Sequence, residues 1–375
     1  MRIESLTFFR FLAAIIVVFF HFGRNTELAK IAHPIILSGP QMVTFFFVLS
    51  GFVMMISHYH KNETLRNYYV ARFARIFPIY IVALMIMAYF VYGYGNNNMT
   101  GLLLSATFLQ SWFPPYPLSF NDPGWSLSVE ALFYLSFPLI LFVIKKSNIN
   151  ATKFAITALL FYFFTLFLLA NLMTSDFNRG YQTASFDLIY YFPLSHLCGF
   201  LLGVAGGYIY VKNQARFNQS GKLPMILLLA AMFLSYFLLQ YPFYLRRISG
   251  FALNDVPSFY SLFFILLILS VAYANNIITK VLSLPVLVLL GEASYALYIL
   301  QKPVHMAYKL YVSEYLDLSS GGHFYVYLAL LVFISILALY IIEKPSKKLI
   351  FKLNDFISQR TQLKKENTEG IKEKI

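Results

Sequence analysis

The stretch FAITALLFYFFTLFLLANLMTS, residues 154–175, contains no Asp, Glu, Lys or Arg. As a helix rising about 1.5 Å per residue, it is long enough to cross the roughly 30 Å hydrocarbon core of a bilayer. Further charge-free stretches occupy residues 31–60, 76–121, 188–211, 223–245, 256–279 and 318–342. Because backbone polar groups inside a bilayer must be satisfied within the helix, these stretches predict an all-α polytopic membrane protein.

The composition excludes an ordinary water-soluble globule. Of the 375 residues, 59% are hydrophobic and 19% aromatic. Only 12% are charged, against about a quarter in soluble domains. The mean hydropathy is +0.66. The single cysteine, Cys198, excludes an intrachain disulfide and a Cys-rich zinc site, so we expect no bound metal.

Turn residues and polar clusters divide the chain into ten predicted spans. They lie at about 6–23, 41–58, 73–94, 125–144, 153–174, 187–211, 223–241, 257–274, 284–311 and 322–343. The segment 102–112 is too short to cross and is interpreted as a half-helix or interfacial segment. The first span resembles a signal peptide, but it contains Arg10 and has no small-residue cleavage site, so we keep it as structure. We expect one membrane domain over 1–343 and a charged cytoplasmic tail over 344–375.

The positive charges predict the orientation, because cytoplasmic loops hold an excess of Lys and Arg. With the N-terminus inside, 22 of the 29 Lys and Arg residues lie on the inner side, and the outer loops hold five. Both termini are then cytoplasmic. The net charge of +13 is explained by the anionic inner leaflet, and no nucleic-acid partner is expected.

Four ionisable residues lie within the apolar spans, where such residues usually mark a pathway or a reaction centre: Arg10, His21, Glu130 and Glu292. Arg10 and His21 are eleven residues apart, so a helix places them on one face about 16 Å apart along its axis. The simpler alternatives are a snorkelling anchor for Arg10 and an interfacial histidine for His21.

Arg72 and Arg75 are three residues apart just before the third predicted span, so a helical start would place both guanidinium groups on one face. Two such groups suit a phosphate or diphosphate, although a plain positive-inside anchor explains them too. Glu130 lies about one turn into the fourth span, at a depth that we expect to match His21. A histidine paired with a carboxylate could activate a hydroxyl group, and a structural ion pair is the alternative for Glu130.

The chain resembles the integral-membrane acyltransferase family 3 in a series of motifs that follow one another in the family's order. The matching segments are Arg10 with His21 eleven residues later, FFFVLSGF at 45–52, RFARIFPIY at 72–80, QSW at 110–112, WSLSVE at 125–130, FYL at 133–135, LGEASYALY at 290–298 and EKP at 343–345. The resemblance covers roughly residues 1–350. The chain departs from the family at Gln301, where members often have a histidine, and His305 follows one turn later.

The resemblance implies a membrane O-acyltransferase that moves an acyl group, usually acetyl, from cytoplasmic acyl-CoA to a hydroxyl of a cell-surface or lipid-linked glycan. It implies acyl-CoA as a co-substrate, no permanently bound cofactor, a carbohydrate acceptor, a separate extracytoplasmic partner enzyme for any later step, and a location in the cytoplasmic membrane. The implied roles are catalytic for His21 and Glu130, donor-binding for Arg10, Arg72 and Arg75, and acceptor-binding for Trp125, Ser128, Tyr295 and Gln301.

Other functions stay open at this point. His21 could act as a general base or form an acyl-histidine intermediate. The acceptor could be a small hydroxylated metabolite in place of a glycan. Ten spans with buried charges would also suit a secondary transporter or flippase, although the two halves show no convincing internal repeat.

Overall fold

The computed structural model describes residues 3–95, 98–217, 222–274 and 276–372. The outermost residues of the two predicted domains, 1–2 and 373–375, lie outside these ranges. The described residues form helices joined by turns and loops, and no strand occurs among them. The α-helices are α1 (Glu4–Phe22), α2 (Glu27–Ile31), α3 (His33–Ile36), α4 (Gly39–His58), α5 (Leu65–Gly93), α6 (Met99–Ala106), α7 (Trp125–Lys146), α8 (Ala151–Thr174), α9 (Ala184–Tyr190), α10 (Leu197–Phe217), α11 (Lys222–Gln240), α12 (Pro242–Ser249), α13 (Ser261–Tyr273), α14 (Ile277–Leu282), α15 (Pro285–Tyr311), α16 (Ser320–Ala338) and α17 (Lys344–Lys372).

The membrane character predicted from the sequence is confirmed. Within the described part of the chain, seven helical segments are long and apolar enough to cross a membrane. They are Glu4–Phe22, Gly39–His58, Leu65–Gly93, Asp122–Lys146, Ala151–Thr174, Ala184–Asn213 and Ser320–Arg360. Three of the predicted spans are not among these seven. They are α11, α13, which is only 13 residues long, and α15, which carries Glu292, Lys302 and Lys309.

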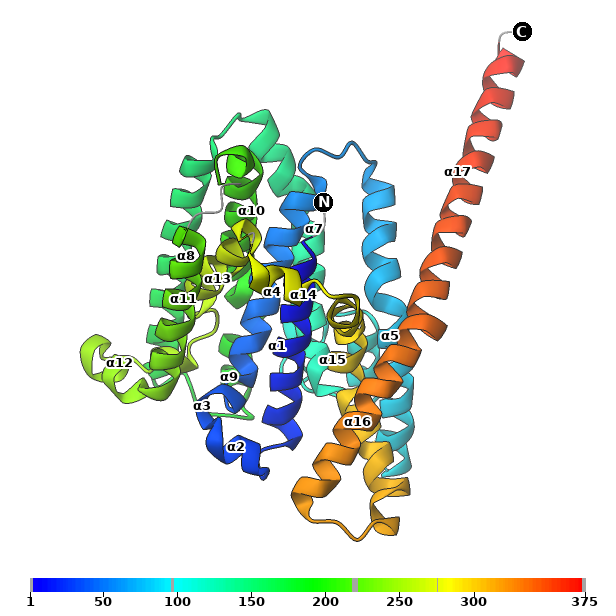
Figure 1. The fold of residues 1–375 in the computed structure, drawn as a ribbon. Coiled ribbons are helices and arrows are strands. Elements are labelled where there is room, and N and C mark those ends of the chain that lie inside the picture. The colour runs from blue at the N-terminus through cyan, green and yellow to red at the C-terminus, as the bar shows by residue number, and fades with distance from the viewer. Residues whose placement is uncertain (1–2, 96–97, 218–221, 275, 373–375) are drawn as a thin grey trace.

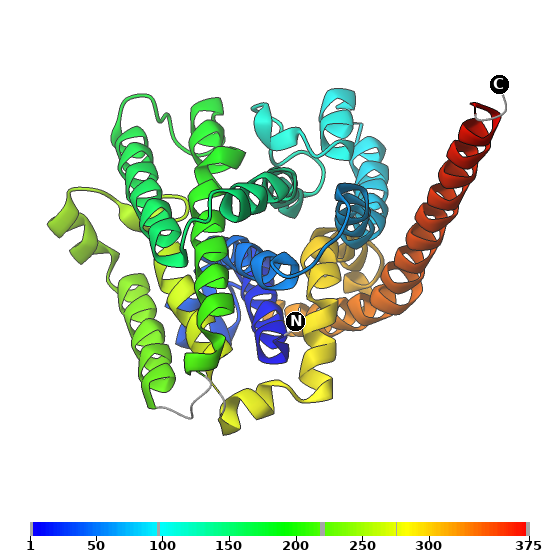
Figure 2. The same cartoon turned by 90° about the horizontal axis from the view of Figure 1, so that it is seen from above.

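Helices α1 and α4 lie at the centre of the bundle. Figures 1 and 2 show α8, α10, α11 and α13 on one side of this pair and α5, α15, α16 and α17 on the other. The central helices approach closely because glycines remove side chains at the crossings. A Cβ on Gly203 of α10 would collide with the Val48 carbonyl of α4, and a Cβ on Gly291 of α15 would collide with the Thr7 carbonyl of α1. Small residues at such crossings allow the backbone contacts that hold helices together in lipid.

Short irregular segments separate several helices. The predicted span 187–211 is divided into α9 and α10 by residues 191–196, which include the 3₁₀ turn Pro193–His196. The segment predicted as a half-helix forms α6 and the 3₁₀ turn Gln110–Trp112. A π-helical turn at Leu339–Glu343 joins α16 to α17. The predicted tail therefore continues the last apolar helix, and α17 leaves the bundle only towards its C-terminal end (Figure 1).

Candidate functional site

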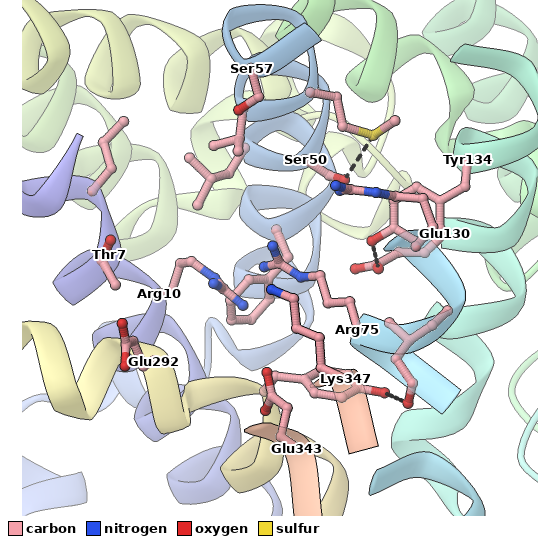
Figure 3. Close-up of a pocket in the computed structure, with 18 of the residues that line it drawn as sticks. Thr7, Arg10, Ser50, Ser57, Arg75, Glu130, Tyr134, Glu292, Glu343 and Lys347 are labelled. Atoms are coloured by element: carbon pink, nitrogen blue, oxygen red, sulfur yellow. Dashed lines mark hydrogen bonds between the residues drawn. The ribbon is translucent and has the colours of Figure 1, made fainter. Parts of the chain in front are cut away.

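A cavity of about 420 Å³ lies between α1, α4, α5, α7, α15 and the start of α17 (Figure 3). Its described lining holds eight ionisable Arg, Lys and Glu side chains: Arg10, Arg72, Arg75, Glu130, Glu292, Glu343, Lys344 and Lys347. Five of these are cationic and three are carboxylates, so they sum to a charge of +2. We call this space the arginine cavity. Clustered cations with incomplete compensation inside a protein favour a polyanionic ligand.

The arginines of α5 lie deeper in the helix than the sequence indicated. Helix α5 begins at Leu65, where the Thr64 side chain accepts a hydrogen bond from the Asn67 amide. Arg72 and Arg75 therefore belong to the third turn, on the face that lines the arginine cavity. The Arg72 guanidinium lies 5.8 Å from the ring centres of both Tyr68 and Tyr134. Its Nε is buried and has no hydrogen-bond partner among the described residues.

Glu130 lines the arginine cavity from the second turn of α7. Its Oε2 accepts a hydrogen bond of 2.6 Å from the Tyr134 hydroxyl, one turn further along the helix (Figure 3). The positive charges that act on Glu130 are those of Arg75, Arg10 and Arg72. A carboxylate held in this way neutralises part of the charge of the guanidinium groups.

The expected pairing of Glu130 with His21 is corrected by this arrangement. His21 ends α1 eleven residues beyond Arg10, about 16 Å along the helix axis, and it is not part of the described lining of the arginine cavity. The carboxylate that acts on the exposed His21 side chain is Asp122, in the turn before α7. Glu130 does not pair with His21 because the two lie at different depths. Glu130 is eight residues further along the chain into the membrane domain than Asp122, the carboxylate that acts on His21.

A charged pair sits beside His21. The Lys302 ammonium of α15 donates a 2.6 Å hydrogen bond to Asp122 Oδ1, and both charges act on His21. The neighbouring Phe22 ring stacks on His305 with 4.1 Å between ring centres. We call His21, Asp122 and Lys302 the histidine end of α1. Sequence reasoning missed Asp122 and Lys302, because nothing in the sequence indicates that residues 180 apart form an ion pair.

The four residues expected to bind the acceptor occupy different surroundings. Tyr295 lines the arginine cavity and donates a 2.7 Å hydrogen bond to the Ile76 carbonyl. Trp125 is 8% exposed and packs edge-on against Phe47. Ser128 and Gln301 are fully buried, and each side chain donates a hydrogen bond to a backbone carbonyl. Their roles towards an acceptor stay predictions. Trp125 makes a ring-packing contact here, and Ser128 and Gln301 make hydrogen bonds to the backbone.

Further cavity residues were not predicted from the sequence. The further lining residues are Tyr134, Glu343 at the end of the π-helical turn, and Lys344 and Lys347 in the first turn of α17. π-Helical turns are frequent at functional sites. The signal available in the sequence was the segment EKP at 343–345. The described residues contain no group of three or more His, Cys, Asp or Glu side chains that could hold a metal ion.

Comparison with known proteins gives a family-level match. A family model described as an acyltransferase domain matches residues 3–342. The acyltransferase MdmB of Streptomyces mycarofaciens is 32% identical over 39% of this chain and 41% of its own length. The peptidoglycan O-acetyltransferase OatA of Listeria monocytogenes is 24% identical over 80% of this chain and 49% of its own length. This chain thus covers less than half of either relative. No solved structure matches the chain.

Proposed function

The chain belongs to acyltransferase family 3 and is a membrane acyltransferase, and from this premise we propose that it moves an acetyl group from acetyl-CoA to a hydroxyl of a cell-surface or lipid-linked glycan. The observation that carries the proposal is the arginine cavity with its three guanidinium groups. Arginine forks match phosphate oxygens in charge and geometry, and an acyl-CoA carries a diphosphate. The acetyl group and the glycan acceptor are suggested by the relative named a peptidoglycan O-acetyltransferase.

We further propose ten membrane spans with both termini in the cytoplasm. Helices α11, α13 and α15 would add three spans to the seven that length and hydropathy identify. With this orientation the arginine cavity lies towards the cytoplasmic side, because Thr7 near the start of α1 and Ser57 near the end of α4 line it. Acyl-CoA is made and held in the cytoplasm, so the cytoplasmic membrane is the location that this account requires.

The proposed reaction takes place at the histidine end of α1. The phosphates bind in the arginine cavity, and the pantetheine arm extends along α1 over the roughly 16 Å to His21. His21 Nε2 or Nδ1 removes the proton from the acceptor hydroxyl, whose oxygen attacks the thioester carbonyl carbon. The C–S bond then breaks, and the CoA thiolate takes the proton from the imidazolium. An acyl-His21 intermediate is the alternative route.

The donor assignment is tested by labelling with [acetyl-¹⁴C]acetyl-CoA. Membranes holding the wild type, Arg75→Ala or Arg66→Ala at equal level are compared for label in the glycan fraction. Arg66 is the matched control, because it lies on the same helix but hydrogen-bonds to the Asn354 carbonyl outside the arginine cavity. We expect the Arg75 variant to lose most of the labelling and the Arg66 variant to keep it. Equal labelling by all three would contradict the proposed donor site.

A further inference from the structure

The mouth of the arginine cavity is built partly by residues that follow the stretch 3–342 matched by the family model. The family match ends at residue 342, and α17 begins at Lys344. Lys344 and Lys347 nevertheless line the arginine cavity, and Figure 3 shows Lys347 projecting into the same space as Arg10 and Arg75. Lys344 is the middle residue of the EKP segment at 343–345, and Lys347 lies outside the segments that resemble the family's motifs.

The lysines continue outward along one face of α17. Lys344, Lys348 and Lys352 are four residues apart, and Lys347 lies between them on the same side of the helix. A second cavity of about 750 Å³ follows this face, and Lys344 and Lys347 line both cavities. The basic face thus connects the arginine cavity to the second cavity, whose described lining ends at Gln359.

Two carboxylates lie at the inner end of this path, Glu292 and Glu343, and Asp355 lines the second cavity further out. Lys344 Nζ lies 3.4 Å from Glu292 Oε2. The charges of Arg75, Arg10 and Lys347 all act on Glu343, whose Oε2 is buried without a hydrogen-bond partner in the part of the chain that the structure describes. With five cations against three carboxylates, the described lining keeps a charge of +2 that a further anion would neutralise.

We propose that Lys347 and Lys348 bind the 3′-phosphate of the acyl-CoA while the arginines of α5 bind its diphosphate. The inference rests on the proposed function. The diphosphate is directly joined to the pantetheine arm, so it must lie deeper, whereas the 3′-phosphate sits on the adenosine ribose and remains nearer the mouth. A lysine ammonium suits a phosphate monoester as a point charge, and both lysines are exposed on the side where the nucleotide would emerge.

The test compares acetyl-CoA with 3′-dephospho-acetyl-CoA as donors, using the full-length protein in nanodiscs of neutral phosphatidylcholine. We expect the wild type to have a KM about tenfold lower for acetyl-CoA, and the Lys347→Ala/Lys348→Ala variant to have nearly equal KM values for both donors. Arg360→Ala is the matched control, because Arg360 lies on α17 over the Phe356 ring and is not part of the described lining of either cavity. It should keep the wild-type preference.

The outcomes separate this inference from the proposed function. A wild type that uses both donors equally, or a double variant that keeps the preference, overturns the lysine site but leaves the donor assignment standing. An effect of the double variant that is seen only in nanodiscs with anionic lipid overturns it in favour of a phospholipid headgroup. A wild type that uses neither donor contradicts the proposed function itself. Should the double variant unfold, Lys347→Gln alone gives the same comparison of the two donors.

Discussion

The two ends of α1 differ in what they can do. At one end, Arg10 faces a cavity of about 420 Å³ with further arginines and lysines around it. At the other end, about 16 Å away, His21 is exposed beside the Asp122–Lys302 ion pair. The first end is built to hold a large anion, and the second presents one titratable base near a carboxylate.

This difference suggests a division of work between binding and chemistry. Contacts to remote parts of a substrate supply binding energy, while a general base acts only on the reacting atoms. Changes at the arginine cavity should therefore act on the KM for acyl-CoA, and changes at the histidine end should act on kcat.

The largest effect is expected from His21→Ala. Loss of a general base typically lowers the rate by about 10²–10⁴-fold, and we expect a fall of this size in acetyl transfer with unchanged acetyl-CoA binding. Transfer and equilibrium binding of labelled acetyl-CoA are measured on the same preparation. His33→Ala is the control, because His33 is exposed on the short helix α3. Retention of more than about a tenth of the activity in His21→Ala would exclude His21 as the base.

The two carboxylates give the second comparison. Asp122→Asn removes the charge that acts on His21, so we expect kcat to fall about tenfold with little change in the KM for acetyl-CoA. Glu130→Gln removes a carboxylate whose charge acts on the arginines of the cavity, so we expect the KM to rise about tenfold with a smaller change in kcat. Steady-state kinetics with both variants give the kcat and the KM for acetyl-CoA that test these two expectations. Exchanged phenotypes would restore Glu130 as the partner of His21.

A smaller effect is expected from Tyr134→Phe, which removes only the hydrogen bond to Glu130. A hydrogen bond to a charged group contributes about 1.5–3 kcal/mol, and the nearby arginines should reduce the loss to the lower end of that range. We expect a lower unfolding temperature in nanodiscs and an acetyl-CoA KM raised a few-fold. Tyr69→Phe serves as the control, since the Tyr69 hydroxyl is exposed and its bond to the Leu135 carbonyl is 3.4 Å long. Equal shifts in both variants would argue against a role for the Glu130 contact.

The smallest effect is expected from salt. Raising the ionic strength from about 0.1 M to 1 M shortens the Debye length from about 10 Å to about 3 Å. The exposed lysines at the cavity mouth should then attract acyl-CoA less, and we expect its KM to rise a few-fold while kcat changes little. A kinetic series in sodium chloride measures this. A salt effect confined to kcat would contradict the separation of the two ends.

The helices could be predicted from the sequence because apolar stretches of membrane length have few alternatives. The expected span 6–23 is α1, Glu4–Phe22, and the expected span 125–144 is α7, Trp125–Lys146. Five of the nine predicted site residues line one cavity, namely Arg10, Arg72, Arg75, Glu130 and Tyr295. Intramembrane charge and helical spacing were sufficient to single out the first four.

The features that could not be predicted depend on how separate helices are placed relative to one another. Sequence position gives depth only to within a turn or two, so Glu130 was placed level with His21 when Asp122 is the nearer carboxylate. The π-helical turn at Leu339–Glu343 has no signature in the hydropathy pattern. The predicted boundary at 343 therefore separated Lys344 and Lys347 from the arginine cavity that they line.

The most direct test of the account is the side of the membrane from which acetyl-CoA is taken. Inverted and right-side-out vesicles from bacteria producing the protein are given [acetyl-¹⁴C]acetyl-CoA, which does not cross the bilayer, and label in glycan is counted. The account predicts labelling in inverted vesicles, and in right-side-out vesicles only after permeabilisation, with Arg75→Ala low in both. Labelling of intact right-side-out vesicles would place the arginine cavity on the outer face and contradict the account.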